Sequence, residues 1–196
     1  MPKVTEAYRD ARRDEIAAAA LRCFAAKGFH RTSMADIIAE SGLSAGAIYG
    51  HYESKEALLS TVAGRILSAR GSELQALSGD HPLSPGEIVA ALIAGIRSEP
   101  FDTSLLLQVW AEAAVNPELR EVLQGVLVRV RATLRPHVLA WAEGHPEHSG
   151  GDPSGYADRV IPVLMGLLPG FIVQRAVIAD FDADAYVAAI PGLLPH

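Results

Sequence analysis

Apolar residues recur along most of the chain at the three- and four-residue spacing of a helix, and no alternating strand pattern lasts five residues. Ile16, Ala20 and Phe24 form one such stripe, and Gly28 follows as a stop signal. The pattern predicts an all-α protein of about nine helices. Their predicted ranges are 5–27, 33–41, 44–52, 54–78, 84–98, 101–115, 117–144, 154–179 and 182–194.

Residues 33–52 read as a helix, a short glycine-containing turn and a second helix, with a supporting helix on either side. Ser33 with Asp36 three residues later predicts a capping box, and Ser44 is placed to cap the next helix. This layout is typical of a helix-turn-helix unit in a three-helix bundle. We therefore expect a DNA-binding domain over residues 1–54, a long linking helix over 54–78 and a second domain over 79–196.

The stretch "SAGAIYGHYESK", residues 44–55, has an unusual composition for a helix. Gly46, Ala47 and Gly50 are small, whereas Tyr49 and Tyr52 can donate hydrogen bonds or pack on bases. A helix that enters the major groove of DNA needs small residues close to the backbone and side chains that reach phosphates. The alternative is that both tyrosines belong to the core.

The net charge of −6 at first disfavours nucleic acid as a partner. Residues 1–60 hold eight basic and eight acidic residues, however, so the whole excess of negative charge lies in residues 61–196. A neutral DNA-binding segment must depend on a few well-placed groups and on the dipoles of helix N-termini.

The run "GFHRTSMADIIAESGLSAGAIYGHYESKEALL", residues 28–59, resembles the DNA-binding signature of the TetR family of bacterial transcriptional regulators. The resemblance implies an all-helical homodimer that binds a palindromic operator, usually to repress, and that a small molecule releases from DNA. It implies contacts to DNA by residues in and around the second and third helices. These are Thr32, Ser33, Ser44, Tyr49, His51, Tyr52 and Lys55 toward phosphates, and Ala45, Gly46, Ala47 and Gly50 toward bases.

Family members often carry polar residues at the positions of Ala45 and Ala47. Because alanine cannot hydrogen-bond a base edge, we expect specificity to rest on methyl contacts, on His51 or Tyr49, and on DNA shape.

The second domain shows no catalytic constellation, no phosphate-binding loop and no paired cysteines, so we expect neither an enzyme nor a cofactor. His145, His148 and Asp152 are close in sequence, but they lie in a Gly/Pro-rich stretch that favours a solvated loop over a metal site. Aromatic and polar residues of the later helices could line a pocket for a small apolar effector. The candidates are Phe101, Gln108, Trp110, Arg131, His137, Trp141, Met165, Phe171 and Gln174.

The helices near 154–179 and 182–194 are apolar on nearly all sides, which predicts a four-helix interface between two copies of the chain. Pro162 and Pro169 predict either a curved helix or a break near Pro169. The longest uncharged run, 160–174, is shorter than a membrane span needs. The single Cys23 and the charged N-terminus agree with a cytoplasmic protein.

Two other functions remain open from the sequence. One is an activator with the same DNA chemistry. The other is a helical dimer that binds a small molecule or a protein and has no useful affinity for DNA.

Overall fold

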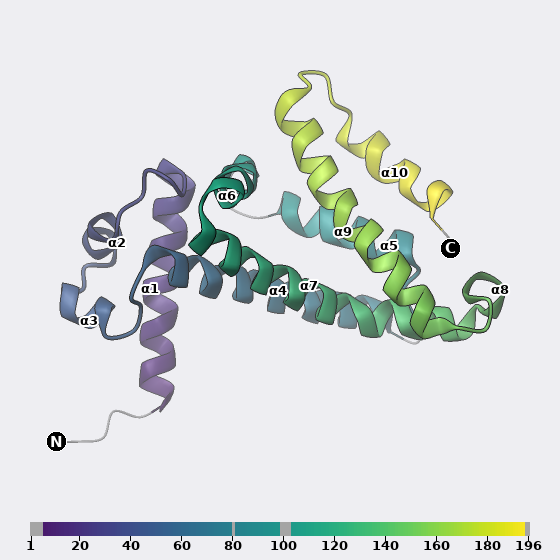
Figure 1. The fold of residues 1–196 in the computed structure, drawn as a ribbon, viewed down its shortest axis with the longest axis horizontal. Helices are drawn as coiled ribbons and strands as arrows, with labels where there is room; N and C mark the ends of the chain where they lie inside the picture. The colour runs from purple at the N-terminus through teal and green to yellow at the C-terminus, as the bar shows by residue number, and fades with distance from the viewer. Residues whose placement is uncertain (1–5, 80, 99–102, 195–196) are drawn as a thin grey trace. The chain divides into compact units, whose positions relative to one another are not determined.

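The computed structural model describes residues 6–79, 81–98 and 103–194, and these ranges contain ten helices and no strand. Figure 1 shows their order along the chain. The helices are α1 Glu6–Lys27, α2 Met34–Ser41, α3 Ala45–Tyr49, α4 Lys55–Ser78, α5 Pro85–Arg97, α6 Ser104–Val115, α7 Pro117–Gly144, α8 Pro146–Ser149, α9 Pro153–Val177 and α10 Ala183–Leu193. The predicted all-α class is confirmed, and the additional helix is the four-residue α8, which lies in a stretch predicted as loop.

The chain folds into two compact units. The first comprises Met1–Arg65 with Leu105–Val126, and the second comprises Ile66–Ser104 with Leu127–His196. The boundaries fall inside α4 and α7, so both helices run through from one unit into the other. Most of α6 and the first turns of α7 therefore group with the N-terminal helices, although sequence reasoning assigned them to the second domain.

The core of the first unit begins with the apolar stripe of α1. Ile16, Ala20 and Phe24 are fully buried, and the Phe24 ring lies 5.3 Å from the ring of Phe29, centroid to centroid. Burial of each large side chain contributes about 1.5–3 kcal/mol to folding. Cys23 is also buried, and loss of solvent raises the pKa of its thiol, so it acts as a small core residue.

The core of the second unit is formed by α5 against α9 and α10. Ile88 and Ile93 of α5 are fully buried, as is Ile161 of α9. Gly86 lies where a Cβ atom would come within 3.3 Å of the Pro191 backbone. The absence of a side chain at this position allows α5 and α10 to approach closely.

Helix α9 runs without a break from Pro153 to Val177, so of the two alternatives, a curved helix or a break near Pro169, the break is wrong. Proline removes one backbone donor and crowds the preceding turn. In that turn the Tyr186 hydroxyl of α10 donates a hydrogen bond of 3.1 Å to the Leu167 carbonyl. This tertiary contact joins α10 to α9 in the turn before Pro169.

Because α9 is continuous, its apolar segment is longer than the uncharged run 160–174 alone. The uncharged run lies within a 25-residue helix that is long and apolar enough to cross a membrane. Core helices of soluble proteins can have the same length and composition. Only 22% of the most apolar stretch of α9 is buried within the single chain, so much of its apolar surface is left uncovered.

Asp36 stabilises the start of α2 through its charged form. The Lys27 ammonium, 2.5 Å from its carboxylate, and two hydrogen bonds from Ser33 hold the pKa of Asp36 well below its usual range. A carboxyl group whose pKa is lower in the folded state stabilises the fold when it is charged. This stabilisation is present above the pKa of the unfolded state, about 4, and is lost as the pH falls below it.

We therefore expect the free energy of unfolding to decrease as the pH falls below about 4. The D36N variant should show a shallower decrease in urea denaturation experiments across this range. Parallel pH profiles for the variant and the parent chain would contradict this role of Asp36.

Candidate nucleic-acid interface

Local capping builds the helix-turn-helix. The Ser33 side chain accepts a hydrogen bond from the Asp36 amide while the Asp36 carboxylate accepts one from the Ser33 amide, which confirms the predicted capping box. Gly42 ends α2 with a φ of +68°, a left-handed conformation that glycine adopts without strain. Ser44 then caps α3 by accepting from the Ala47 amide at 3.3 Å.

Helix α3 has one buried residue and an otherwise open surface. Ile48 is fully buried and fixes the helix on the core, whereas Tyr49 is 51% exposed. Ala45, Gly46 and Gly50 are exposed as well. A Cβ atom added to Gly46 would meet nothing within 4 Å, so protein packing does not require glycine there. The outer surface of α3 is therefore small and accessible, as a helix close to DNA needs.

Thr32 is not placed to contact a phosphate. Its side chain is 2% exposed, and its hydroxyl donates to the Gly28 carbonyl at 2.7 Å, with the Cys23 carbonyl at 3.2 Å. Its amide donates to the Phe29 carbonyl. Thr32 instead satisfies carbonyls at the end of α1, and Ser33 remains the exposed candidate beside it.

Lys55 also has an internal role. Its ammonium donates to the carbonyls of Phe29 at 3.1 Å and His30 at 3.2 Å, and it lies 4.6 Å from the centre of the Phe29 ring. Two of its three donors are thus engaged in the corner between α1 and α2. A phosphate contact by Lys55 would use the remaining donor.

Tyr52 is buried, with 6% of its surface exposed, and its hydroxyl has no hydrogen-bond partner among the described residues. The alternative that Tyr52 packs in the core is therefore correct for its ring. Tyr49 is exposed and His51 is half-buried, so both remain available to a ligand.

Sequence reasoning missed the contribution of α6 to this unit. The Gln108 side chain lies so close to Gly28 that a Cβ atom there would clash with its Oε1 atom. The Glu112 carboxylate lies 3.2 Å from Nδ1 of His30. These partners are about eighty residues apart, and no local pattern could have indicated them.

Comparison with known proteins identifies this arrangement. Residues 16–62 match the family model "Bacterial regulatory proteins, tetR family", and residues 86–194, more than half of the chain, match "BetI-type transcriptional repressor, C-terminal". The chain belongs to the TetR family of bacterial transcriptional regulators.

Individual relatives agree with the TetR assignment. UidR of Escherichia coli K12 is 29% identical over 117 residues, 57% of each chain. BetI of Serratia proteamaculans is 31% identical over 134 residues, 63% of this chain and 64% of that protein. The chain thus spans less than two thirds of these curated relatives. The solved structure of Salmonella enterica GusR is 27% identical and covers 99% of this chain and 100% of its own, with a TM-score of 0.66.

The described residues predicted to bind the effector are divided between the two units. Gln108 and Trp110 lie on α6 in the first unit, and Phe101 lies outside the described residues. In the second unit Trp141 stacks on His145 at 4.2 Å, whereas Phe171 packs against Tyr186 at 5.4 Å.

The other predicted effector residues have varied surroundings. Arg131 pairs with Asp158 at 3.0 Å, and Gln174 donates to the Gly170 carbonyl. His137 is half-buried near Ser78, and burial lowers its pKa. Met165 is half-buried on α9.

Within the described ranges, no group of three His, Cys, Asp or Glu side chains could hold a metal ion. Nδ1 of His145 lies 2.8 Å from the Trp141 carbonyl, and the Asp152 carboxylate accepts from the Gly155 amide at the start of α9. His148 stacks on Trp141 at 5.4 Å. These three side chains therefore contribute to helix ends and ring packing.

The Lys55 contacts predict a loss of stability when its charge is removed. In K55Q the carbonyls of Phe29 and His30 lose a charged donor, and the ring contact is lost as well. We expect the free energy of unfolding to fall by about 2 kcal/mol in urea denaturation.

The control is R22Q, which removes the exposed Arg22–Glu40 ion pair and should cost less than about 1 kcal/mol. If K55Q has the same free energy of unfolding as the parent chain and loses only DNA affinity, Lys55 binds DNA and does not stabilise the corner between α1 and α2.

Proposed function

We propose that the chain is a repressor that binds a palindromic operator as a homodimer and is released by a small apolar effector. The DNA-binding part of the proposal depends most on α3. The buried Ile48 anchors this short helix, and its other residues are mostly small and accessible. Its place in a capped helix-turn-helix, within a chain of the TetR family, supports entry of α3 into the major groove. We place the protein in the cytoplasm, where its DNA would be.

A homodimer is supported by the exposed apolar surface of the last two helices. Val163 is 57% exposed and Val177 73% exposed on α9, and Leu193 is 79% exposed on α10. Exposed aliphatic surface of this kind is typical of a surface that a partner covers. Two copies related by a twofold axis would bury it and would present two α3 helices to half-sites one helical turn apart, about 34–36 Å.

Release is proposed to follow from a shift between two arrangements of the dimer. An effector that prefers the arrangement with the wrong α3 spacing weakens DNA binding by its differential affinity for the two states. Helix α6 supports such coupling, because the Gln108 side chain lies against Gly28 and the Glu112 carboxylate pairs with the His30 ring in the corner that leads into α2. The effector is proposed to be apolar, since aromatic and aliphatic side chains dominate the second unit.

Gly46 separates a role in DNA contact from a role in folding. Alanine at this helical position should maintain or raise the free energy of unfolding, because a Cβ atom meets nothing and glycine is the weaker helix former. Against the duplex that the protein enriches from a random DNA pool, G46A should bind at least about tenfold more weakly, a difference of about 1.4 kcal/mol.

Gly64 on α4 gives the matched control, because a Cβ atom there also meets nothing within 4 Å. G64A should resemble G46A in stability and the parent chain in DNA affinity. Equal DNA affinities for G46A and the parent chain would contradict the proposal that α3 enters the major groove.

The proposed interface predicts that a charge on α9 separates the subunits. V163D should raise the dimer dissociation constant at least about tenfold in sedimentation equilibrium, because each copy would bury an unpaired carboxylate. The control is V128D on α7, where Val128 is 68% exposed and should remain in solvent. A dimer unaffected by V163D would place the interface elsewhere.

A further inference from the structure

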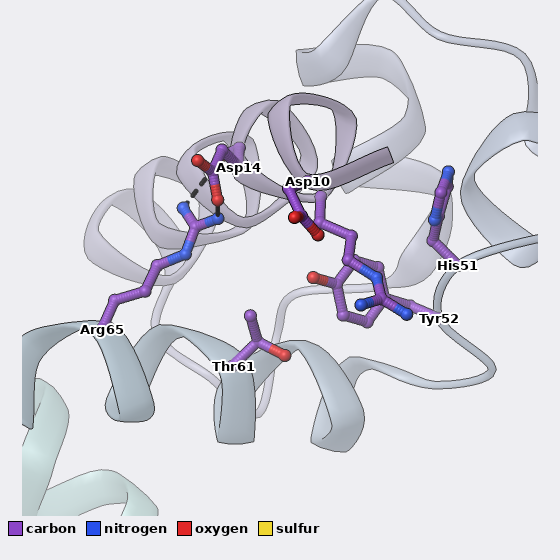
Figure 2. Close-up of a pocket in the computed structure, with 7 residues that line it drawn as sticks. Asp10, Asp14, His51, Tyr52, Thr61 and Arg65 are labelled. Atoms are coloured by element: carbon purple, nitrogen blue, oxygen red, sulfur yellow. Dashed lines mark hydrogen bonds and ion pairs between the residues drawn. The ribbon is translucent and has the colours of Figure 1, made fainter. Parts of the chain in front are cut away.

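The first unit contains a polar cavity of about 430 Å³ beside the helix-turn-helix. Its walls come from α1, from the two residues that precede the loop into α4, and from α4 itself, as Figure 2 shows. The lining residues are Asp10, Arg13, Asp14, His51, Tyr52, Thr61 and Arg65.

The hydroxyl of Tyr52 is an unsatisfied group in this cavity wall. The side chain is 94% buried, and the hydroxyl oxygen is buried with no hydrogen-bond partner among the described residues. In Figure 2 it points into the space between Asp10 and Thr61. A buried hydroxyl without a partner destabilises the free protein, and a ligand oxygen in the cavity can accept a hydrogen bond from it.

The charges around the cavity are only partly paired. Arg65 binds the Asp14 carboxylate and donates to the Asp14 carbonyl at 3.1 Å, so these two side chains neutralise each other. No described ion pair or hydrogen bond involves the side chain of Arg13, which is exposed. A guanidinium in this state is suited to bind a phosphate through two parallel hydrogen bonds. Asp10 carries the opposing charge.

The position of the cavity indicates which phosphate it meets. His51 and Tyr52 follow directly after α3, the helix proposed to enter the major groove. A helix that lies in the groove ends beside the sugar-phosphate backbone, so residues just after α3 lie next to phosphates. Arg13 lines the same cavity, so a phosphate bound there would lie beside a guanidinium from α1.

We propose that this cavity binds one backbone phosphate of the operator, with Arg13 as its cation and the Tyr52 hydroxyl as a second donor. The inference rests on the proposed DNA-binding function and adds a contact from α1. The Asp10 carboxylate repels the phosphate that Arg13 attracts. The cavity therefore contributes to DNA affinity, but Asp10 limits that contribution.

Variants of the cavity have opposite expected effects on affinity for the enriched duplex. R13Q should weaken binding about tenfold and should reduce the slope of log affinity against log salt concentration by about one. D10N should strengthen binding severalfold. Y52F should weaken binding while leaving the thermal unfolding temperature unchanged or higher, because the hydroxyl it removes has no partner in the free protein.

R9Q is the matched control, because Arg9 is exposed one turn earlier on α1 and does not line the cavity. Its salt slope should stay closer to that of the parent chain than the slope of R13Q does. Equal losses for R9Q and R13Q, with no gain for D10N, would show only a general effect of charge and would overturn the proposal.

Inorganic phosphate tests the other source of the same anion. We expect no binding of inorganic phosphate alone in titration calorimetry at millimolar concentration. Binding of inorganic phosphate that R13Q abolishes, with DNA affinity unchanged, would reassign the cavity to a free phosphate-bearing molecule. If the parent chain enriches no duplex at all, the proposed function itself fails, which is distinct from failure of this contact.

Discussion

The ammonium of Lys55 closes the corner between α1 and α2 by binding the carbonyls of Phe29 and His30. Those carbonyls follow the end of a helix and have no place in its hydrogen-bond ladder, so a charged donor stabilises the turn strongly. Thr32 satisfies two further carbonyls in the same corner, and Gly28 supplies its left-handed residue with a φ of +77°. The angle at which α2 leaves α1, and hence the position of α3, depends on this corner.

The same corner receives contacts from α6, through Gln108 at Gly28 and Glu112 at His30. Elements far apart in sequence therefore meet at the point that orients the proposed DNA-binding helix. In the proposed function, α6 couples the effector to this corner. The corner supports the helix-turn-helix, and in that proposal it also controls DNA affinity.

Helix positions could be predicted from sequence because their signals are local. Ser33 and Ser44 cap their helices as expected, and the range of α7 agrees with the prediction at both ends. The hydrogen-bond partners of side chains such as Thr32 and Lys55 could not be predicted from local signals. Thr32 and Lys55 match the family signature, yet their hydroxyl and ammonium groups bind carbonyls up to 26 residues away, which only the folded chain brings near.

The effector residues remain a prediction. Trp141 and Phe171 are aromatic residues on apolar helices, a pattern typical of pockets and of cores alike. In the structure each packs in its own ring cluster, Trp141 with Tyr156 and Phe171 with Phe181. At Pro169 the sequence left a curved helix and a break both open, and only the structure shows that α9 is continuous.

The most direct measurement is selection of bound duplexes from a random DNA pool by the purified protein, followed by titration of the enriched duplexes across a salt series. We expect a palindrome about two helical turns long, bound by two chains, with affinity that falls steeply as the salt concentration rises. The absence of enrichment, even after the protein is unfolded and refolded to remove any bound effector, would contradict this expectation. Such a result would favour a helical dimer that binds a small molecule or a protein without reading DNA.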